Sequence, residues 1–162
     1  MKEIVKIYNE SMNEIPDYAN DGDAGMDVRA NLHGVQNKFL FNAEFDGERV
    51  IIHPFGRALI PTGIYTSFDK NIECQVRSRS GLALKSGVFV LNSPGTIDSG
   101  YRNEYGVILF NTSNSDFIVE QGDRIAQLVF NRIERVYFEV VDNKEDLDSS
   151  DRGGGFGSTG VK

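Results

Sequence analysis

Short apolar runs separated by turn-forming residues recur along most of the chain, and this pattern constrains the fold more than any other feature. Val88–Leu91 and Val107–Phe110 are typical runs, because each has the length of a strand and the residues between them are rich in glycine and serine. With 17 glycines, 11 phenylalanines and no tryptophan, the composition also favours short strands and turns over long helices. We therefore predict an all-β domain of about ten short strands, arranged as a sandwich or a barrel.

Other apolar runs place the remaining strands. A hairpin is expected between residues 33 and 55, where Phe39–Phe41 and Val50–Ile52 flank a turn at Asp46–Gly47. A Gly-Asp pair at 122–123 divides residues 117–130 into strand, turn and strand. Further strands are expected at residues 2–8, 24–30, 57–68, 72–76 and 136–141.

One short helix is expected after Ser80 and Gly81, because Leu82–Lys85 contains good helix formers. Its free backbone N–H groups would form an anion site, to which Arg79 adds a full positive charge. Alternatively, Ser80 is an ordinary N-cap on a small connecting helix. The segment alone favours neither interpretation.

The overall charge limits the classes of partner. A net charge of -7 and a pI near 4.8 argue against direct binding to nucleic acid, because the protein would repel the phosphates. Several arginines gather between Arg77 and Arg135, so a small polyanion bound in one pocket remains compatible with the sequence. The alternative is that these arginines are solvated or paired with nearby acids.

Cysteine and histidine are scarce. Cys74 is the single cysteine, which excludes an intramolecular disulfide and a multi-cysteine zinc site. His33 and His53 do not form a metal-binding spacing. Residues 1–8 lack a continuous apolar segment, so we expect neither a signal peptide nor a membrane span, and a cytoplasmic protein.

The stretch between the two central runs carries the most suggestive chemistry. Asp98 lies among turn residues, next to the aromatic ring of Tyr101. A hairpin of this kind offers backbone donors and acceptors, a charge and a flat face, which suit a polar, planar ligand. The alternative is an ordinary surface hairpin. Asp27 and Gln127 are polar residues in predicted strands. Asp27 faces either solvent or a ligand. Gln127, inside an apolar run, either hydrogen-bonds to backbone groups or faces a site.

The last part of the chain differs in composition. We divide the chain into a β domain at 1–141 and an acidic linker with a glycine-rich arm at 142–162. The ten residues 142–151 span ~33 Å when stretched, enough to reach a neighbouring subunit. The arm 152–160 can wrap phosphates with backbone N–H groups, although a functionless tail is the alternative.

Five segments occur in an order that resembles one known family. They are Ala24–Asp27, Arg79–Ala83, Gly95–Arg102, Gly122–Gln127 and Arg152–Gly160. Together they resemble the five motifs of the trimeric dUTP pyrophosphatases (dUTPases). The resemblance spans residues 24–160, so it is far more specific than any single motif.

This resemblance implies a jelly-roll-like β fold and a homotrimer with sites shared between subunits. The implied reaction converts dUTP and water to dUMP and pyrophosphate, with Mg²⁺ held by the triphosphate. Asp98 matches the general base that activates water for attack on the α-phosphorus. Asp27 matches a carboxylate that supports the water shell of the metal or the local arginine network.

The resemblance also implies substrate contacts. Asn92 and the backbone of Gly95–Ile97 would pair with uracil, and Tyr101 would lie under the deoxyribose and exclude a 2'-hydroxyl. Phe156 would stack on uracil, while arm residues grip the outer phosphates. The implied substrate-binding residues are Arg79, Ser80, Gly81, Asn92, Gly95, Thr96, Ile97, Tyr101, Gln127, Arg152, Phe156, Gly157, Ser158 and Thr159.

The sequence departs from the family at a few positions. Ser78 replaces the usual proline, Asn103 replaces the usual glycine, and residues 33–53 form an extended hairpin. One alternative is a dCTP deaminase of the same fold, which would need a glutamate where Ile108 stands. Another is a regulator of this fold that binds a protein partner through residues 33–53.

Overall fold

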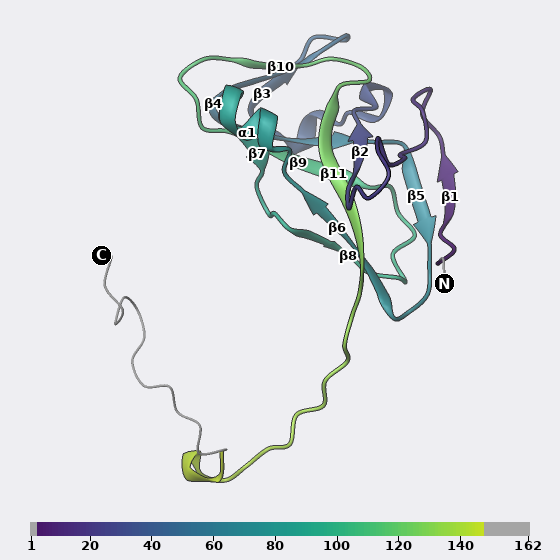
Figure 1. Ribbon diagram of the computed structural model, residues 1–162. Coiled ribbons are helices and arrows are strands. Elements are labelled where there is room, and N and C mark those ends of the chain that lie inside the picture. Colours follow the sequence, from purple (N-terminus) through teal and green to yellow (C-terminus); the bar gives the residue numbers. More distant parts are fainter. Residues whose placement is uncertain (1–2, 148–162) are drawn as a thin grey trace.

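The computed structural model describes residues 3–147, and within this range the chain is almost entirely β structure (Figure 1). The strands are β1 (Lys6–Asn9), β2 (Met26–Arg29), β3 (Leu40–Phe45), β4 (Val50–Pro61), β5 (Ile64–Ser67), β6 (Ile72–Arg77), β7 (Val88–Val90), β8 (Gly95–Ile97), β9 (Gly106–Asn111), β10 (Phe117–Val119) and β11 (Arg124–Arg132). The helices are α1 (Ser80–Ser86) and three short 3-10 turns, η1 (Leu32–Gly34), η2 (Asn37–Phe39) and η3 (Lys144–Asp146).

The strands form two large antiparallel sheets and one small pair. In one large sheet the order is β2-β11-β6-β8. In the other, the order is β10-β4-β9-β7, and β3 also pairs with β4. β1 and β5 form the small pair. The prediction of an all-β sandwich with one short helix is confirmed.

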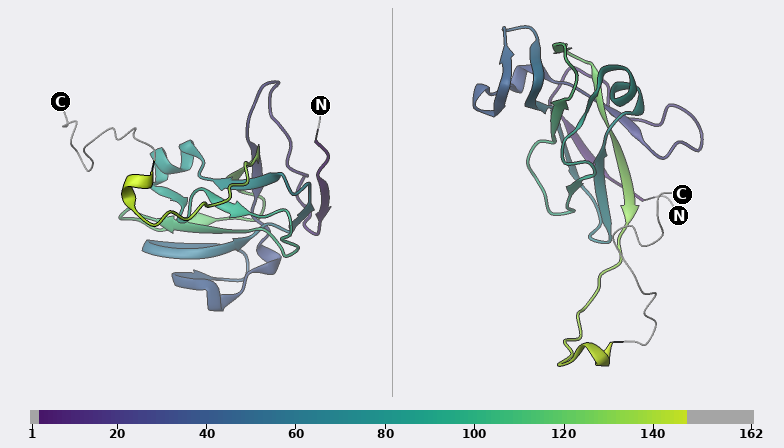
Figure 2. Two further views of the ribbon diagram at one scale, coloured as in Figure 1. Left: turned by 90° about the horizontal axis from the view of Figure 1, so that it is seen from below. Right: turned by 90° about the vertical axis from the view of Figure 1, so that its left-hand side faces the viewer.

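The core lies between the two large sheets, which stack as layers (Figure 2). Alternate residues of β9 point inward, so Val107 and Leu109 are buried while Ile108 is only half-buried. Cys74 and Leu128 come from the facing sheet and belong to the same buried cluster. The period-2 alternation of the sequence therefore sets which face of each strand is buried.

The predicted hairpin near 33–55 forms as β3 and β4, with a tight turn in which Asp46 accepts a backbone N–H bond from Arg49 at 2.7 Å. An irregularity interrupts the pairing at Asn42, whose φ is +49°. Gly56 lies opposite this irregularity, and a Cβ atom there would approach the Asn42 carbonyl oxygen to 2.0 Å. The bulge therefore requires a glycine at position 56.

In two of the predicted hairpins, the path of the chain between the sheets differs from the prediction. β7 and β9 pair as predicted, with Val90 opposite Leu109. However, the segment between them is more than a turn, because β8 crosses to the other sheet and pairs with β6. β10 and β11 likewise lie in different sheets instead of pairing with each other.

The prediction of a last strand at 136–141 is wrong for the single chain. These residues continue beyond β11 in an extended path away from the sheets (Figures 1 and 2). Tyr137 and Phe138 are 95% and 91% exposed. A strand needs a neighbouring strand to satisfy its backbone, and no edge within residues 3–147 pairs with this segment.

None of the helices in the described range is long and apolar enough to cross a membrane. The described part of the predicted acidic linker contains η3, in which Asn143 and Asp146 form a capping box. The domain boundary at residue 141 stays a prediction.

Candidate active site

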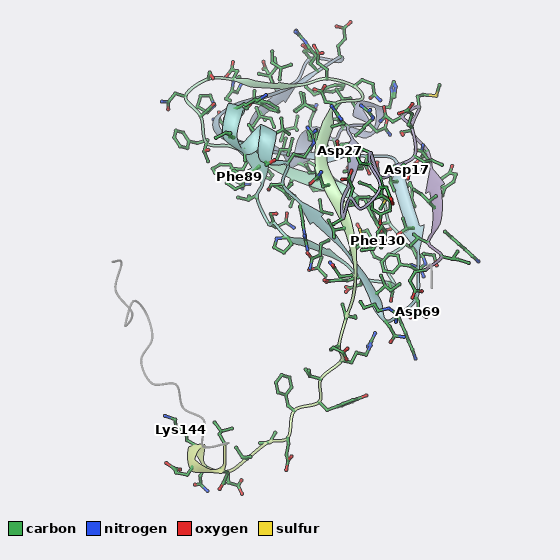
Figure 3. The ribbon with its side chains drawn as sticks, viewed as in Figure 1. Asp17, Asp27, Asp69, Phe89, Phe130 and Lys144 are labelled. Carbon is green, nitrogen blue, oxygen red and sulfur yellow. The ribbon has the colours of Figure 1, made fainter. Side chains whose placement is uncertain are left out.

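A row of polar residues crosses three neighbouring strands of the β2-β11-β6-β8 sheet. Asp27 of β2 lies opposite Gln127 of β11, and Gln127 lies opposite Arg77 of β6. The Gln127 amide Nε2 donates to the Asp27 carboxylate at 3.3 Å. Figure 3 shows Asp27 beside β11, on the part of that strand away from Phe130. A half-buried amide needs a hydrogen-bond partner, and for Gln127 that partner is the Asp27 carboxylate.

Asp27 is also the centre of an arginine cluster. Arg79, immediately before α1, donates from Nε and Nη2 to the two Asp27 oxygens at 2.9 and 3.3 Å. Arg124 donates to Asp27 Oδ2 at 3.3 Å. Two guanidinium charges against one carboxylate leave a single positive charge at this site. That excess suits an anionic ligand.

Arg124 was not among the predicted site residues. Spacing gave no signal for it, because residues three apart on a regular strand point to opposite faces. A register shift between Arg124 and Ala126 lets the Arg124 side chain approach Asp27. Arg79 Nη1 also donates to the backbone carbonyl of Arg124 at 3.1 Å. The two arginines therefore form one unit with Asp27.

The start of α1 lies next to this cluster. Arg79 occupies the N-cap position and Ser80 is the first helical residue, so the interpretation of Ser80 as N-cap is wrong. No side chain caps the helix, and the space around Gly81 is open, with no atom within 4 Å of a Cβ placed there. Backbone N–H groups of the first turn are thus available beside Arg79.

Ser78 shows why the usual proline is not needed here. Its hydroxyl accepts the Val90 N–H at 3.0 Å, and its own N–H donates to Ser93 Oγ at 3.2 Å. A proline has neither group. The serine therefore ties the segment before α1 to β7 by side-chain and backbone bonds.

The predicted uracil-binding segment forms one edge of the same sheet. β8 is the last strand in the order, so its outer edge is unpaired within residues 3–147. Gly95 packs closely against Asn92, whose Nδ2 would lie 3.2 Å from a Cβ at position 95. Thr96 is exposed and Ile97 lies opposite Cys74. Free backbone groups and a side-chain amide thus lie together, as a planar polar ligand requires.

The chain turns sharply after β8. The Tyr101 N–H donates to the Asp98 carbonyl at 3.0 Å, which closes a turn over residues 98–101. Asp98 is exposed, and the Tyr101 side chain is 39% exposed. Within the described residues no side chain pairs with the Asp98 carboxylate. The carboxylate is therefore free to act on a bound molecule.

The Tyr101 ring of the turn lies beside the buried Tyr105, with the two ring centroids 6.4 Å apart. Tyr105 hydrogen-bonds through its hydroxyl to Thr66, and Thr62 donates to the Tyr105 carbonyl at 2.7 Å. Burial raises the pKa of the Tyr105 hydroxyl. Burial also raises the pKa of the neighbouring Cys74 thiol to about 12, so this thiol is protonated and unreactive at neutral pH.

A single chain keeps the arginine cluster and the Asp98 turn apart. Gly95 lies opposite Val76 and Ile97 lies opposite Cys74. β8 therefore extends away from Arg77, the end of the polar row described above. Three residues of strand place Asp98 ~10 Å beyond Gly95. Asp27, Arg79 and Gln127 thus meet, whereas Asp98 does not join them. The predicted arm residues Arg152, Phe156, Gly157, Ser158 and Thr159 lie outside the described range.

No group of three or more His, Cys, Asp or Glu residues in the described range has the arrangement of a metal site. Both Asp27 oxygens already accept bonds from arginine or glutamine. Asp27 therefore fits support of the arginine network better than direct metal coordination.

Comparison with known proteins decides the family. The dUTPase family model matches residues 47–160. The chain belongs to the dUTPase family. It is 50% identical over 152 residues to the deoxyuridine 5'-triphosphate nucleotidohydrolase of Chlamydia muridarum, covering 93% of this chain and 94% of that protein. It is 43% identical to the enzyme of the same name from Fusobacterium nucleatum, with 99% of both chains covered.

Solved dUTPase structures share the fold. A mutant dUTPase of Staphylococcus bacteriophage 80alpha superimposes with a TM-score of 0.77, at 22% identity and with 98% of this chain and 99% of that chain covered. The dUTPase from phage phi11 of S. aureus gives a TM-score of 0.71 at 20% identity, covering 88% and 99%. The implied jelly-roll-like dUTPase fold is thereby confirmed.

Proposed function

We propose that this dUTPase hydrolyses dUTP to dUMP and pyrophosphate, at sites that three copies of the chain complete together. The observation that carries the proposal is the exposed Asp98 carboxylate on a hydrogen-bonded turn next to a free strand edge, in a chain of this family. The Asp27–Arg79–Arg124 cluster supplies the positive charge that a triphosphate needs.

In the proposed reaction, Asp98 accepts a proton from a water molecule that attacks the α-phosphorus. A bond forms between the water oxygen and the α-phosphorus, and the bond from this phosphorus to the α,β-bridging oxygen breaks. Pyrophosphate leaves with the electron pair of that bond. An exposed carboxylate without an ion-pair partner in the described range suits this role, since a paired one would be a weaker base.

Substrate selectivity is assigned to β8 and to Tyr101. The free edge of β8 and the Asn92 amide would hydrogen-bond the uracil edge, and cytosine would present a donor where an acceptor is required. The Tyr101 ring would lie against the deoxyribose and leave no room for a 2'-hydroxyl. Arg79, Ser80, Gly81 and Gln127 would contact the phosphates.

The arm would complete the site, with Phe156 stacked on uracil and Arg152, Gly157, Ser158 and Thr159 on the phosphates. Mg²⁺ bound to the triphosphate would neutralise part of its charge and orient it for attack. A phage phi11 dUTPase of this fold is described as coordinating a structural Mg(II) ion. Asp27 would act on such an ion through water, because its oxygens already have partners.

A homotrimer is supported by two features of the single chain. The first is the separation of Asp98 from the arginine cluster, since a second copy can bring the two together. The second is the segment 136–141, where Val136, Phe138 and Val140 are 72%, 91% and 91% exposed. A groove of about 910 Å³ offers apolar side chains such as Ile7, Ile15 and Phe130 to a segment of this kind.

The proposal is tested by measuring pyrophosphate release from dUTP, dTTP, dCTP and UTP in the presence of Mg²⁺. We expect rapid release from dUTP alone. Asp98→Asn should retain dUTP binding but lower kcat by about 10²- to 10⁴-fold, the usual contribution of a positioned base. Equal turnover of all four nucleotides, or a fully active Asp98→Asn variant, contradicts the proposal.

The deaminase alternative predicts a different product. Ile108 lies on β9 opposite Leu59 and carries no carboxylate to activate water at a cytosine ring. Release of ammonia from dCTP in the same assay would favour the deaminase.

A further inference from the structure

We infer that Arg102 is a positioning residue for the turn that carries Asp98 and Tyr101, an inference that rests on the function proposed above. Arg102 follows the turn and is itself exposed. Its guanidinium nevertheless points back onto the turn backbone. No predicted role involved this side chain.

Arg102 Nη1 donates to backbone carbonyls on both sides of the turn. It lies 2.7 Å from the Ser99 carbonyl, 3.0 Å from the Tyr101 carbonyl and 3.4 Å from the Thr66 carbonyl of β5. The first two bonds fix the shape of the turn. Nη1 carries two hydrogens, so the longer Thr66 contact shares one of them, and it joins the turn to β5, which is paired with β1. One side chain thus connects the loop to a strand that lies outside both large sheets.

The turn has few other restraints. Its only backbone bond within residues 98–101 runs from the Tyr101 N–H to the Asp98 carbonyl. After the turn, the Glu104 carboxylate accepts the Gly63 N–H at 2.6 Å, and the Tyr101 hydroxyl donates to the Glu104 carbonyl at 3.2 Å. Glu104 therefore anchors the far end of the loop, while Arg102 holds the part nearest to Asp98.

The uracil-binding edge does not depend on Arg102. β8 is held by β6 through the pairs Gly95–Val76 and Ile97–Cys74. Loss of Arg102 should therefore leave the base contacts in place and loosen only the carboxylate and the Tyr101 ring. These are the groups proposed to activate water and to exclude the 2'-hydroxyl, so catalysis and sugar selectivity should change together.

The test compares Arg102→Met, which keeps an apolar stem but no donor, with Arg102→Lys, which keeps one charged donor group. For Arg102→Met we expect kcat on dUTP to fall about 10- to 100-fold, as is usual when a catalytic group is misplaced by about 1 Å. KM should change much less than kcat. The ratio of kcat/KM for dUTP over UTP should also fall, and Arg102→Lys should restore part of both effects.

Arg49→Met is the matched control. Arg49 also stabilises a surface turn, by donating from Nη2 to Asp46 at 3.0 Å, but it lies in the β3–β4 hairpin. This variant should lose a charge and a turn contact without changing kcat or sugar selectivity. The melting temperature of each variant shows whether a loss of activity comes from unfolding of the chain or from displacement of the Asp98 turn.

The outcomes distinguish the inference from the function on which it rests. If the unaltered chain releases no pyrophosphate from dUTP, the proposed function is wrong. If the unaltered chain is active and a folded Arg102→Met variant matches it in kcat and in dUTP over UTP selectivity, the positioning role is wrong. A loss of kcat with unchanged selectivity, or an equal loss in Arg49→Met, also overturns it.

Discussion

The guanidinium of Arg79 faces the carboxylate of Asp27 edge to edge, with nitrogen–oxygen distances of 2.9 and 3.3 Å. The two residues come from β2 and from the segment before α1, and both side chains are about one-quarter exposed. This pair therefore orients an arginine that would otherwise be free to move. A fixed guanidinium is the kind that recognises phosphate with directional selectivity.

Asp27→Asn should weaken this arrangement without removing its shape. Arg79 and Arg124 would lose their shared counter-charge, and we expect the free energy of unfolding to fall by about 1 to 3 kcal/mol. The arginines would also lose their fixed orientation, so KM for dUTP should rise. Urea unfolding and steady-state kinetics measure the two effects, with Asp46→Asn in the β3–β4 turn as control. Unchanged stability and KM would show that the carboxylate charge does not organise the cluster.

Truncation before Arg152 tests the arm. The buried core residues of the described β domain all lie between Val28 and Val129, so the shortened chain should fold and melt like the full chain. If the arm grips the phosphates, activity on dUTP should be largely lost. A truncated chain that hydrolyses dUTP as fast as the full chain would remove the arm from the site.

Phe138→Asp tests whether the extended segment 136–141 lies in an interface. In an extended chain Val136, Phe138 and Val140 share one face, and Glu139 points to the other. If the proposed trimer forms through this segment, a buried charge at position 138 should dissociate it, whereas Glu139→Gln should not. Molar mass from light scattering measures the outcome. If both variants keep the mass of the unaltered protein, the segment lies outside the interface.

Alkaline stability should depend on Cys74. Its pKa is 9.0 in an ordinary setting and about 12 in the folded chain, because burial disfavours the thiolate. Between these values the unfolded chain has lost the thiol proton and the folded chain has kept it, so unfolding becomes easier as pH rises. The contribution of Cys74 is fully present below pH 9 and is lost toward pH 12.

Denaturant unfolding between pH 9 and pH 12 measures this dependence, which is at most about 1.4 kcal/mol per pH unit for one group. Cys74→Ala should reduce the slope, although the raised pKa of Tyr105 leaves part of it. An identical slope in the variant would show that the thiol does not titrate differently in the two states.

Local patterns predicted much of the fold, because the alternation in strands such as β9 reports burial directly. They did not predict that β8 joins β6, since three residues beginning with glycine carry too little alternation to indicate a partner. The segment 136–141 has strand composition, but composition does not supply a neighbouring edge. Its failure to pair shows the limit of a propensity.

The candidate site, like the fold, could be predicted from the sequence only in part. Asp98 and Tyr101 are close in sequence, so their common turn was predictable. The contacts among Asp27, Arg79 and Arg124 join residues far apart in the chain. The resemblance to a family implied roles for Asp27 and Arg79, and nothing in the sequence indicated that Arg124 joins them. The side chains of Arg102 and Ser78 hydrogen-bond to backbone atoms of other residues. Every residue has such atoms, so the sequence does not indicate these contacts.

The chain passes from one large sheet to the other between β7 and β8, and again between β10 and β11. Neither sheet is a continuous piece of sequence, so neither can separate from the other and remain intact. We expect the two layers to gain and lose protection from amide hydrogen exchange as a single cooperative unit. A partly folded chain would then expose no half-formed site, and nucleotide would bind only to chains that had completed folding.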